Sequence, residues 1–192
     1  MWHLACSVST DKTVTDMESL DQKNVGHQTC PQDIHDVVKE LKELKEEMKK
    51  LQKEKQVKQV AFSASLRDQG PGDIGPFDTQ IILTFKRVIT NIGNAYNSST
   101  GIFTAPVRGV YHFDWTMKGY GDIPTGGGLF RNGELIFVAY EQQTSGWVTS
   151  SNAASLLLEV GDQVSVRQWE KTRVHDSQFH DTTFSGHLIF TM

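Results

Sequence analysis

The spacing of hydrophobic positions changes near residue 59 of this 192-residue chain. Residues 31–58 carry apolar side chains at alternating intervals of three and four, whereas residues 60–192 alternate apolar and polar residues in short runs separated by glycine-bearing turns. The first spacing is typical of a coiled-coil helix and the second of half-buried strands. Residues 1–29 are polar and without a period. We therefore predict a flexible tail over 1–29, a coiled coil over 31–58 and an all-β head over 60–192.

The helical region carries a narrow apolar stripe, which we call the seam. Its members stand at the first and fourth positions of three successive heptads: Ile34, Val37, Leu41, Leu44, Met48 and Leu51. Lysine and glutamate occupy most other positions, so the stripe is narrower than the face of a core-packed helix, and a parallel coiled coil is favoured. A lone amphipathic helix lying on the head is the alternative. Because isolated helices of this length are barely stable, the head must set the number of strands in the coil.

The head contains clear two-faced strands. The run 109–117 places four large side chains on one face, which we assign to the core: Tyr111, Phe113, Trp115 and Met117. The intervening residues are predicted to face outward or toward a neighbouring subunit: Val110, His112, Asp114 and Thr116. Asn132-Gly133 separates two apolar runs, which is a strong signal for a hairpin. Together these patterns predict an antiparallel β-sandwich.

Composition narrows the class of partner. The net charge is −4 and no segment carries the basic excess that binding to a phosphate backbone demands, so nucleic acid is not an expected partner. No apolar run approaches the roughly 18 residues of a membrane span, so none is expected. The first nine residues are too few and too polar for a signal-peptide core of about 7–15 apolar residues, so no clear signal peptide is predicted.

Five short motifs, in order along about 130 residues, carry a family resemblance. They are Val60-Ala61-Phe62-Ser63-Ala64, Asn91-Ile92-Gly93-Asn94-Ala95-Tyr96, the stretch from Thr100 to Phe113, Gly161-Asp162-Gln163-Val164, and Phe184-Ser185-Gly186-His187-Leu188. Together they resemble the globular head of complement component 1, q subcomponent, which is shared with the cerebellins and adiponectin. A Gly-X-Y collagen stem is absent from the sequence, so the layout is closest to collagen-free, cerebellin-like members.

The resemblance implies a tumour necrosis factor-like jelly roll with Greek-key connections, whereas alternation alone also fits an immunoglobulin-type sandwich. It further implies a secreted, extracellular homotrimer that is not an enzyme and uses no cofactor. The expected function is lectin-like recognition in innate immunity, with a glycan or a microbial surface as the partner. The alternative is a cerebellin- or adiponectin-like signalling ligand for a cell-surface receptor.

Two residues are candidates for covalent modification. Cys30 precedes Pro31 at the predicted start of the helix, and parallel helices would bring the Cys30 residues of neighbouring chains together. An interchain disulfide is therefore predicted in an oxidising compartment, with a free thiol or a bond to Cys6 as the alternatives. Asn97-Ser98-Ser99 matches the sequon for N-glycosylation on a predicted loop.

A repeated His-Asp pair, His175-Asp176 and His180-Asp181, lies before the last strand. The resemblance places Asp181 where adiponectin-like heads carry an acidic residue near calcium, so Asp176 and Asp181 are weak calcium candidates. Imidazoles would instead suit zinc, and a solvated polar loop is the simpler interpretation. Because the acidic cluster is thin, we expect calcium to change little.

No catalytic motif emerges from the sequence. Gly126-Gly127-Gly128 lacks the Lys-Ser/Thr pair and the helix of a phosphate-binding loop, and we interpret it as a flexible entry to a hairpin. Nucleophile elbows, zinc-binding helices and Cys-x-x-Cys pairs are absent from the sequence as well.

Overall fold

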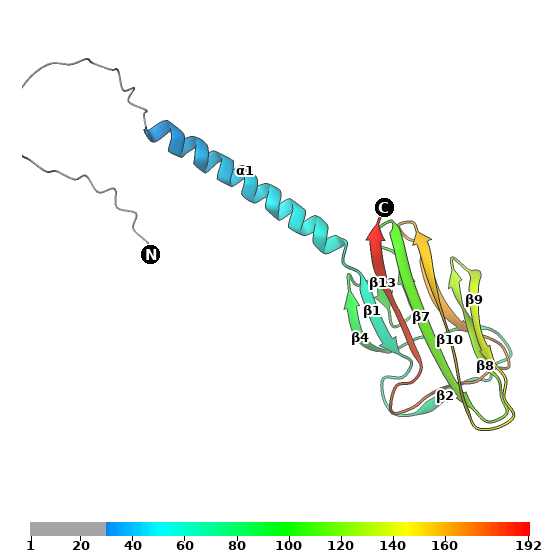
Figure 1. Cartoon of the computed structure of the whole chain (residues 1–192). Helices are drawn as coiled ribbons and strands as arrows, with labels where there is room; N and C mark the ends of the chain where they lie inside the picture. The colour runs from blue at the N-terminus through cyan, green and yellow to red at the C-terminus, as the bar shows by residue number, and fades with distance from the viewer. Residues whose placement is uncertain (1–29) are drawn as a thin grey trace, which may run out of the picture. The chain divides into compact units, whose positions relative to one another are not determined.

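The computed structural model describes residues 30–192, in which one helix precedes thirteen strands (Figure 1). The chain divides into two units between Leu44 and Lys45, within the helix. The predicted tail over residues 1–29, including Cys6, lies outside the described residues.

The helix α1 spans Cys30–Val57, within one residue of the predicted range at each end. Pro31 falls in its first turn, where the missing N–H would have no intrahelical partner. Each seam side chain is between 53% and 62% exposed in the single chain. The helix is thus confirmed, whereas its association into a coil stays a prediction.

The strands form two antiparallel sheets. Sheet I has the order β2-β12-β7-β13-β1-β4, and β10 also pairs with β7. Its strands are β1 (Ala61–Ser65), β2 (Gly72–Ile74), β4 (Arg87–Ile92), β7 (Gly109–Tyr120), β10 (Trp147–Leu158), β12 (Val174–Asp176) and β13 (Thr183–Thr191). Sheet II has the order β5-β6-β11-β8-β9, and β3 also pairs with β11. Its strands are β3 (Ile81–Ile82), β5 (Tyr96–Asn97), β6 (Ile102–Thr104), β8 (Thr125–Arg131), β9 (Glu134–Glu141) and β11 (Gln163–Gln168).

The core lies between the two sheets and is rich in aromatic rings. The four residues assigned to it from strand 109–117 are all fully buried, which confirms that prediction. The Phe62 ring stacks on Tyr96 with centroids 4.6 Å apart and meets Phe184 edge-on at 4.9 Å, while Phe113 meets Phe103 at 5.1 Å. These five residues form what we call the aromatic cluster, and its interlocked rings leave little room for a larger side chain.

The burial of Tyr96 in this cluster has an electrostatic consequence. Its hydroxyl oxygen accepts a hydrogen bond from the backbone N–H of Phe85 at 3.0 Å, which favours the phenolate, but loss of hydration disfavours the phenolate more strongly. Burial therefore raises the pKa of Tyr96 to about 12.

The hairpin predicted at Asn132-Gly133 is confirmed, since it joins β8 to β9. Both residues have positive φ, +50° and +86°, as a two-residue turn of this kind requires. The interpretation of Gly126-Gly127-Gly128 as a flexible entry is wrong, because all three are buried inside β8. A Cβ on Gly127 would lie 2.1 Å from the backbone oxygen of Arg167, so close approach of the neighbouring strand requires glycine.

Candidate functional site

The face of sheet I that points away from the core carries mostly small and polar side chains. The strand register places His187, His112 and Ser155 side by side, and it places Ser185 beside Asp114. His112 Nδ1 lies 3.0 Å from Ser155 Oγ, and the rings of His112 and His187 lie 5.7 Å apart. Such a flat surface, without long side chains that would need to be displaced, can pack closely against another protein surface.

Apolar residues continue this face toward the C-terminus. Leu157 pairs with Val110, which also pairs with Phe190 on the other side, so the three lie in one row across the sheet. A register shift between Leu188 and Phe190 leaves Ile189 and Phe190 about equally exposed. Leu157 and Phe190 are 43% and 53% exposed in this row, and exposed apolar residues that lie together can mark an interface.

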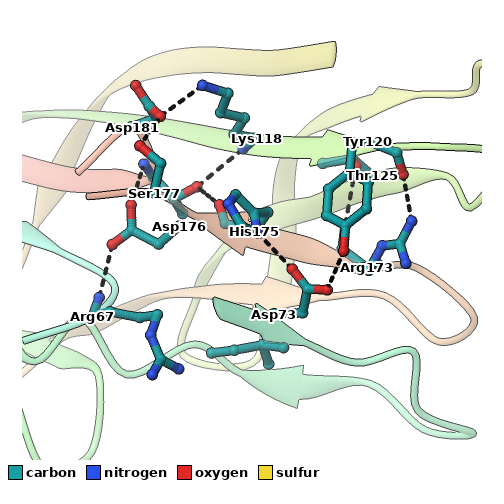
Figure 2. Close-up of polar contacts among 12 residues, drawn as sticks. Arg67, Asp73, Lys118, Tyr120, Thr125, Arg173, His175, Asp176, Ser177 and Asp181 are labelled. Atoms are coloured by element: carbon teal, nitrogen blue, oxygen red, sulfur yellow. Dashed lines mark hydrogen bonds and ion pairs between the residues drawn. The ribbon is translucent and has the colours of Figure 1, made fainter. Parts of the chain in front are cut away.

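The two weak calcium candidates lie near each other but are held by the protein itself (Figure 2). Asp176 ends β12 and is fully buried, where its carboxylate accepts hydrogen bonds from the backbone N–H groups of Arg67 at 2.9 Å and Thr182 at 3.2 Å. The interpretation of this segment as a solvated loop is therefore wrong for Asp176, which instead ties β12 to the chain after β1 and before β13.

Asp181 is engaged in a different way. Its carboxylate accepts a hydrogen bond from Lys118 Nζ at 2.7 Å and another from the Ser177 hydroxyl. The hydrogen bond from Lys118 is the main reason that the pKa of Asp181 lies below its usual value. Within residues 30–192 no group of three or more His, Cys, Asp or Glu side chains is placed to hold a metal ion. The expectation that calcium changes little stays a prediction.

A second polar network lies beside this one and was not foreseen from the sequence. The Asp73 carboxylate on β2 accepts from Tyr120 OH at 2.7 Å and lies 2.6 Å from His175 Nδ1 on β12 (Figure 2). Burial opposes ionisation of Asp73, but these hydrogen bonds outweigh it and hold the pKa of Asp73 below its usual value. The Arg173 guanidinium stacks 4.0 Å from the centre of the Tyr120 ring.

Trp147 extends the second network outward. Its ring centroid lies 4.9 Å from that of Tyr120 and 5.2 Å from that of His175, and Lys118 Nζ lies 5.1 Å from it. The side chain is nevertheless 61% exposed. A large aromatic side chain held in place and open to water is a common feature of recognition surfaces. Trp147 is the first residue of β10, and no local motif in the sequence indicates this position.

The two modification candidates lie on different elements. Asn97 ends β5 and is exposed, and its Oδ1 accepts a hydrogen bond from the backbone N–H of Ser99 at 2.9 Å. Cys30 is the first residue of α1. In the described part of the chain, no helix combines the length and the apolar character that a membrane crossing requires.

The fold and sequence match proteins of one family. Residues 61–189 match the family described as the C1q domain. Complement C1q tumor necrosis factor-related protein 3 of mouse is 39% identical over 110 residues, and its human counterpart is 38% identical; each match covers 56% of this chain and 44% of the relative. Complement C1q tumor necrosis factor-related protein 6 of mouse is 32% identical over 111 residues, 56% of this chain and 42% of that protein. The chain thus spans less than half the length of these relatives.

Solved structures agree on the fold. The globular domain of zebrafish complement 1qA protein matches with a TM-score of 0.53 and 20% identity, over 70% of this chain and 99% of that one. Murine APRIL matches with a TM-score of 0.55 and 14% identity, over 69% of this chain and all of that one. These likenesses support a tumour necrosis factor-like β-sandwich for the head, while residues 61–189 carry the sequence signature. The chain belongs to the C1q domain family.

Proposed function

We propose that this chain acts as an extracellular homotrimer whose heads recognise other molecules. The observation that carries the proposal is the exposed seam of α1, because six apolar side chains at strict a/d spacing have more than half of their surface in water. Burying the exposed half of each would contribute about 1 kcal/mol per side chain, as an upper estimate. A parallel coil of identical helices is the simplest partner for this stripe.

The outward face of sheet I supports self-association independently of the helix. Its apolar row of Val110, Leu157 and Phe190 lies beside small residues that allow close contact. Family membership adds to this, because the resemblance already implied a trimer of heads. Secretion likewise follows from the family and is part of the proposal.

Recognition by several weak sites at once follows from such an assembly. Three identical heads on one particle can exceed the affinity of a single site by about 10²–10⁴ on a surface that presents many ligands. We favour a glycan or microbial surface as the target. The tumour necrosis factor-related names of the most similar relatives support the alternative, a signalling ligand for a cell-surface receptor.

Sedimentation equilibrium of the full chain tests the assembly, with an expected mass of three times 21.5 kDa. Leu44→Glu places charge in the seam and should weaken association, whereas Lys42→Glu changes a position outside the seam and should not. Phe190→Glu tests the sheet face in the same way. A wild-type chain that stays monomeric at micromolar concentration would refute the proposal.

The choice between the two targets needs a binding experiment. A glycan array and a bacterial pull-down should retain the trimer if it recognises surfaces. Saturable binding to one cell-surface receptor, with no retention on glycans, would favour the signalling role. In either case Leu44→Glu should weaken binding to a multivalent surface much more than binding to a soluble monovalent ligand.

A further inference from the structure

A groove of about 750 Å³ opens on sheet II, where β8, β9 and the turn after β11 meet. Its apolar walls are Pro124, Phe130, Leu135, Tyr140 and Trp169. The volume falls within the range of roughly 300–1,000 Å³ that small-molecule sites occupy. None of its lining residues belongs to the outward face of sheet I or to either polar network, although the backbone N–H of Arg173 donates to the oxygen of Pro124 at 2.9 Å.

Two glycines of β8 make the groove possible. A Cβ on Gly126 would lie 2.5 Å from Cδ2 of Tyr140, and a Cβ on Gly128 would lie 2.5 Å from Cδ1 of Leu135. The side chains of β9 therefore lie against β8 only because these positions have none of their own. Glycine inside a strand costs about 0.5–1 kcal/mol relative to alanine, so two such residues on one face indicate that this close packing matters to the protein.

Two aromatic rings of the groove, Tyr140 and Trp169, lie close together, and we call this pair the platform. The centroids of Tyr140 and Trp169 lie 5.8 Å apart with their planes 32° from parallel. The backbone N–H of Trp169 donates to the oxygen of Gly126 at 3.1 Å, and the Thr172 hydroxyl lies 2.8 Å from the oxygen of Trp169. These hydrogen bonds fix the turn that carries Trp169, so binding of a ligand would not include the entropic cost of ordering this turn.

The rim of the groove carries one acidic, one basic and one amide side chain. Lys171 lines it, but its ammonium group forms an ion pair with Asp78. Glu170 and Gln80 also line it, and neither side chain has a hydrogen-bond or ion-pair partner within residues 30–192. The rim therefore offers one uncompensated carboxylate and one free amide, which can accept and donate hydrogen bonds.

We propose that this groove binds a neutral saccharide of about two pyranose rings. The C–H face of a pyranose is apolar and matches the platform of Tyr140 and Trp169, while its hydroxyl groups donate to Glu170 and exchange hydrogen bonds with Gln80. The uncompensated carboxylate disfavours sialylated, sulfated and phosphorylated ligands. A cationic side chain could also stack on one of these ring faces, so binding of an arginine-rich peptide is the competing outcome of the test. The inference deepens the proposed function, on which its biological meaning rests.

Calorimetric titration of the full chain with lactose, cellobiose, maltose and N,N′-diacetylchitobiose tests the proposal. We expect at least one of these disaccharides to bind with a dissociation constant of about 0.1–1 mM and with little dependence on salt. Tyr140→Ala should weaken that binding about tenfold, and Tyr140→Phe should restore most of it. Phe137→Ala is the matched control, because Phe137 is an exposed ring of the same strand that does not line the groove.

A second pair of variants tests the charge of the rim. Glu170→Gln should weaken binding of the neutral disaccharide about threefold to tenfold, while Glu141→Gln at the end of β9 should change it less than twofold. Sialyllactose should bind the wild type more weakly than lactose does, and this difference should shrink in Glu170→Gln. Thermal unfolding of each variant separates lost binding from lost folding.

Three results would overturn the assignment. They are the absence of binding by all four disaccharides at about 10 mM, equal losses from the alanine variants at 140 and 137, and salt-sensitive binding of an arginine-rich peptide in preference to the sugars. Each head contains a whole groove, so binding of a monovalent disaccharide does not require the trimer. Failure of the groove and failure of the trimer therefore give different results.

Discussion

Gly186→Ala is the sharpest test of how tightly the core is packed. Gly186 pairs with Phe113 of β7 on one side and with Phe62 of β1 on the other. An added Cβ would lie 2.5 Å from Cδ1 of Phe113 and 2.7 Å from Cε1 of Phe62. Both rings belong to the aromatic cluster, where Tyr96 and Phe103 hold them in place. Neither ring can move away without disturbing several others, so the added methyl group overpacks the core.

The expected cost follows from this geometry. Overpacking by one methyl group typically destabilises a core by about 1–3 kcal/mol. The head is of a size at which 1 kcal/mol shifts the melting temperature by about 4 °C, so we expect a loss of about 4–12 °C. Far-ultraviolet circular dichroism measures the loss in melting temperature. The two proteins are compared at equal concentration, because a difference in association would otherwise shift the transition.

A double-mutant cycle separates ring contact from a general effect of the substitution. In a Phe113→Leu background the nearest ring is gone, so Gly186→Ala should cost less there, with a coupling of about 1 kcal/mol. An unchanged melting temperature for Gly186→Ala would show that the cluster yields easily. The same loss in both backgrounds would show that Phe113 is not the obstacle, and either result would refute the reasoning.

Three further predictions concern the surface. Lys118 lowers the pKa of Asp181, so this ion pair should stabilise the fold above about pH 4, and the stabilisation should be lost as the pH falls through the lowered pKa. Asp181→Asn should therefore reduce the free energy of unfolding by up to about 0.5 kcal/mol at pH 7 and should not change it near pH 2, as measured by urea unfolding. Protein from an oxidising host should show disulfide-linked species on non-reducing gels that vanish on Cys30→Ser and persist on Cys6→Ser. Protein from a eukaryotic secretory host should lose a glycosidase-sensitive gel shift on Asn97→Gln, and a shift that persists would contradict the assignment.

Local pattern alone was enough to predict the helix, the buried face of one long strand and one hairpin. The a/d spacing predicted α1 to within one residue at each end, and strict alternation predicted the buried face of β7. Asn132-Gly133 predicted its hairpin, because few residue pairs adopt positive φ at both positions. In each case the signal and the structure it specifies lie within the same few residues, and the hydrophobic period of a strand or helix is fixed by its own backbone geometry.

The polar networks and the groove depend instead on which distant segments the sheets bring together. Asp73 lies 102 residues from His175 and 47 from Tyr120, and no local pattern pairs them. Asp176 appeared to belong to a solvated loop, yet backbone donors from Arg67 and Thr182 make its burial possible. The sequence by itself thus determined the elements, the family and the exposed seam. Only the tertiary structure decided which carboxylates accept hydrogen bonds from distant residues and where the glycines of β8 allow a groove. The reason is that burial and hydrogen bonding across strands arise only when the register is set.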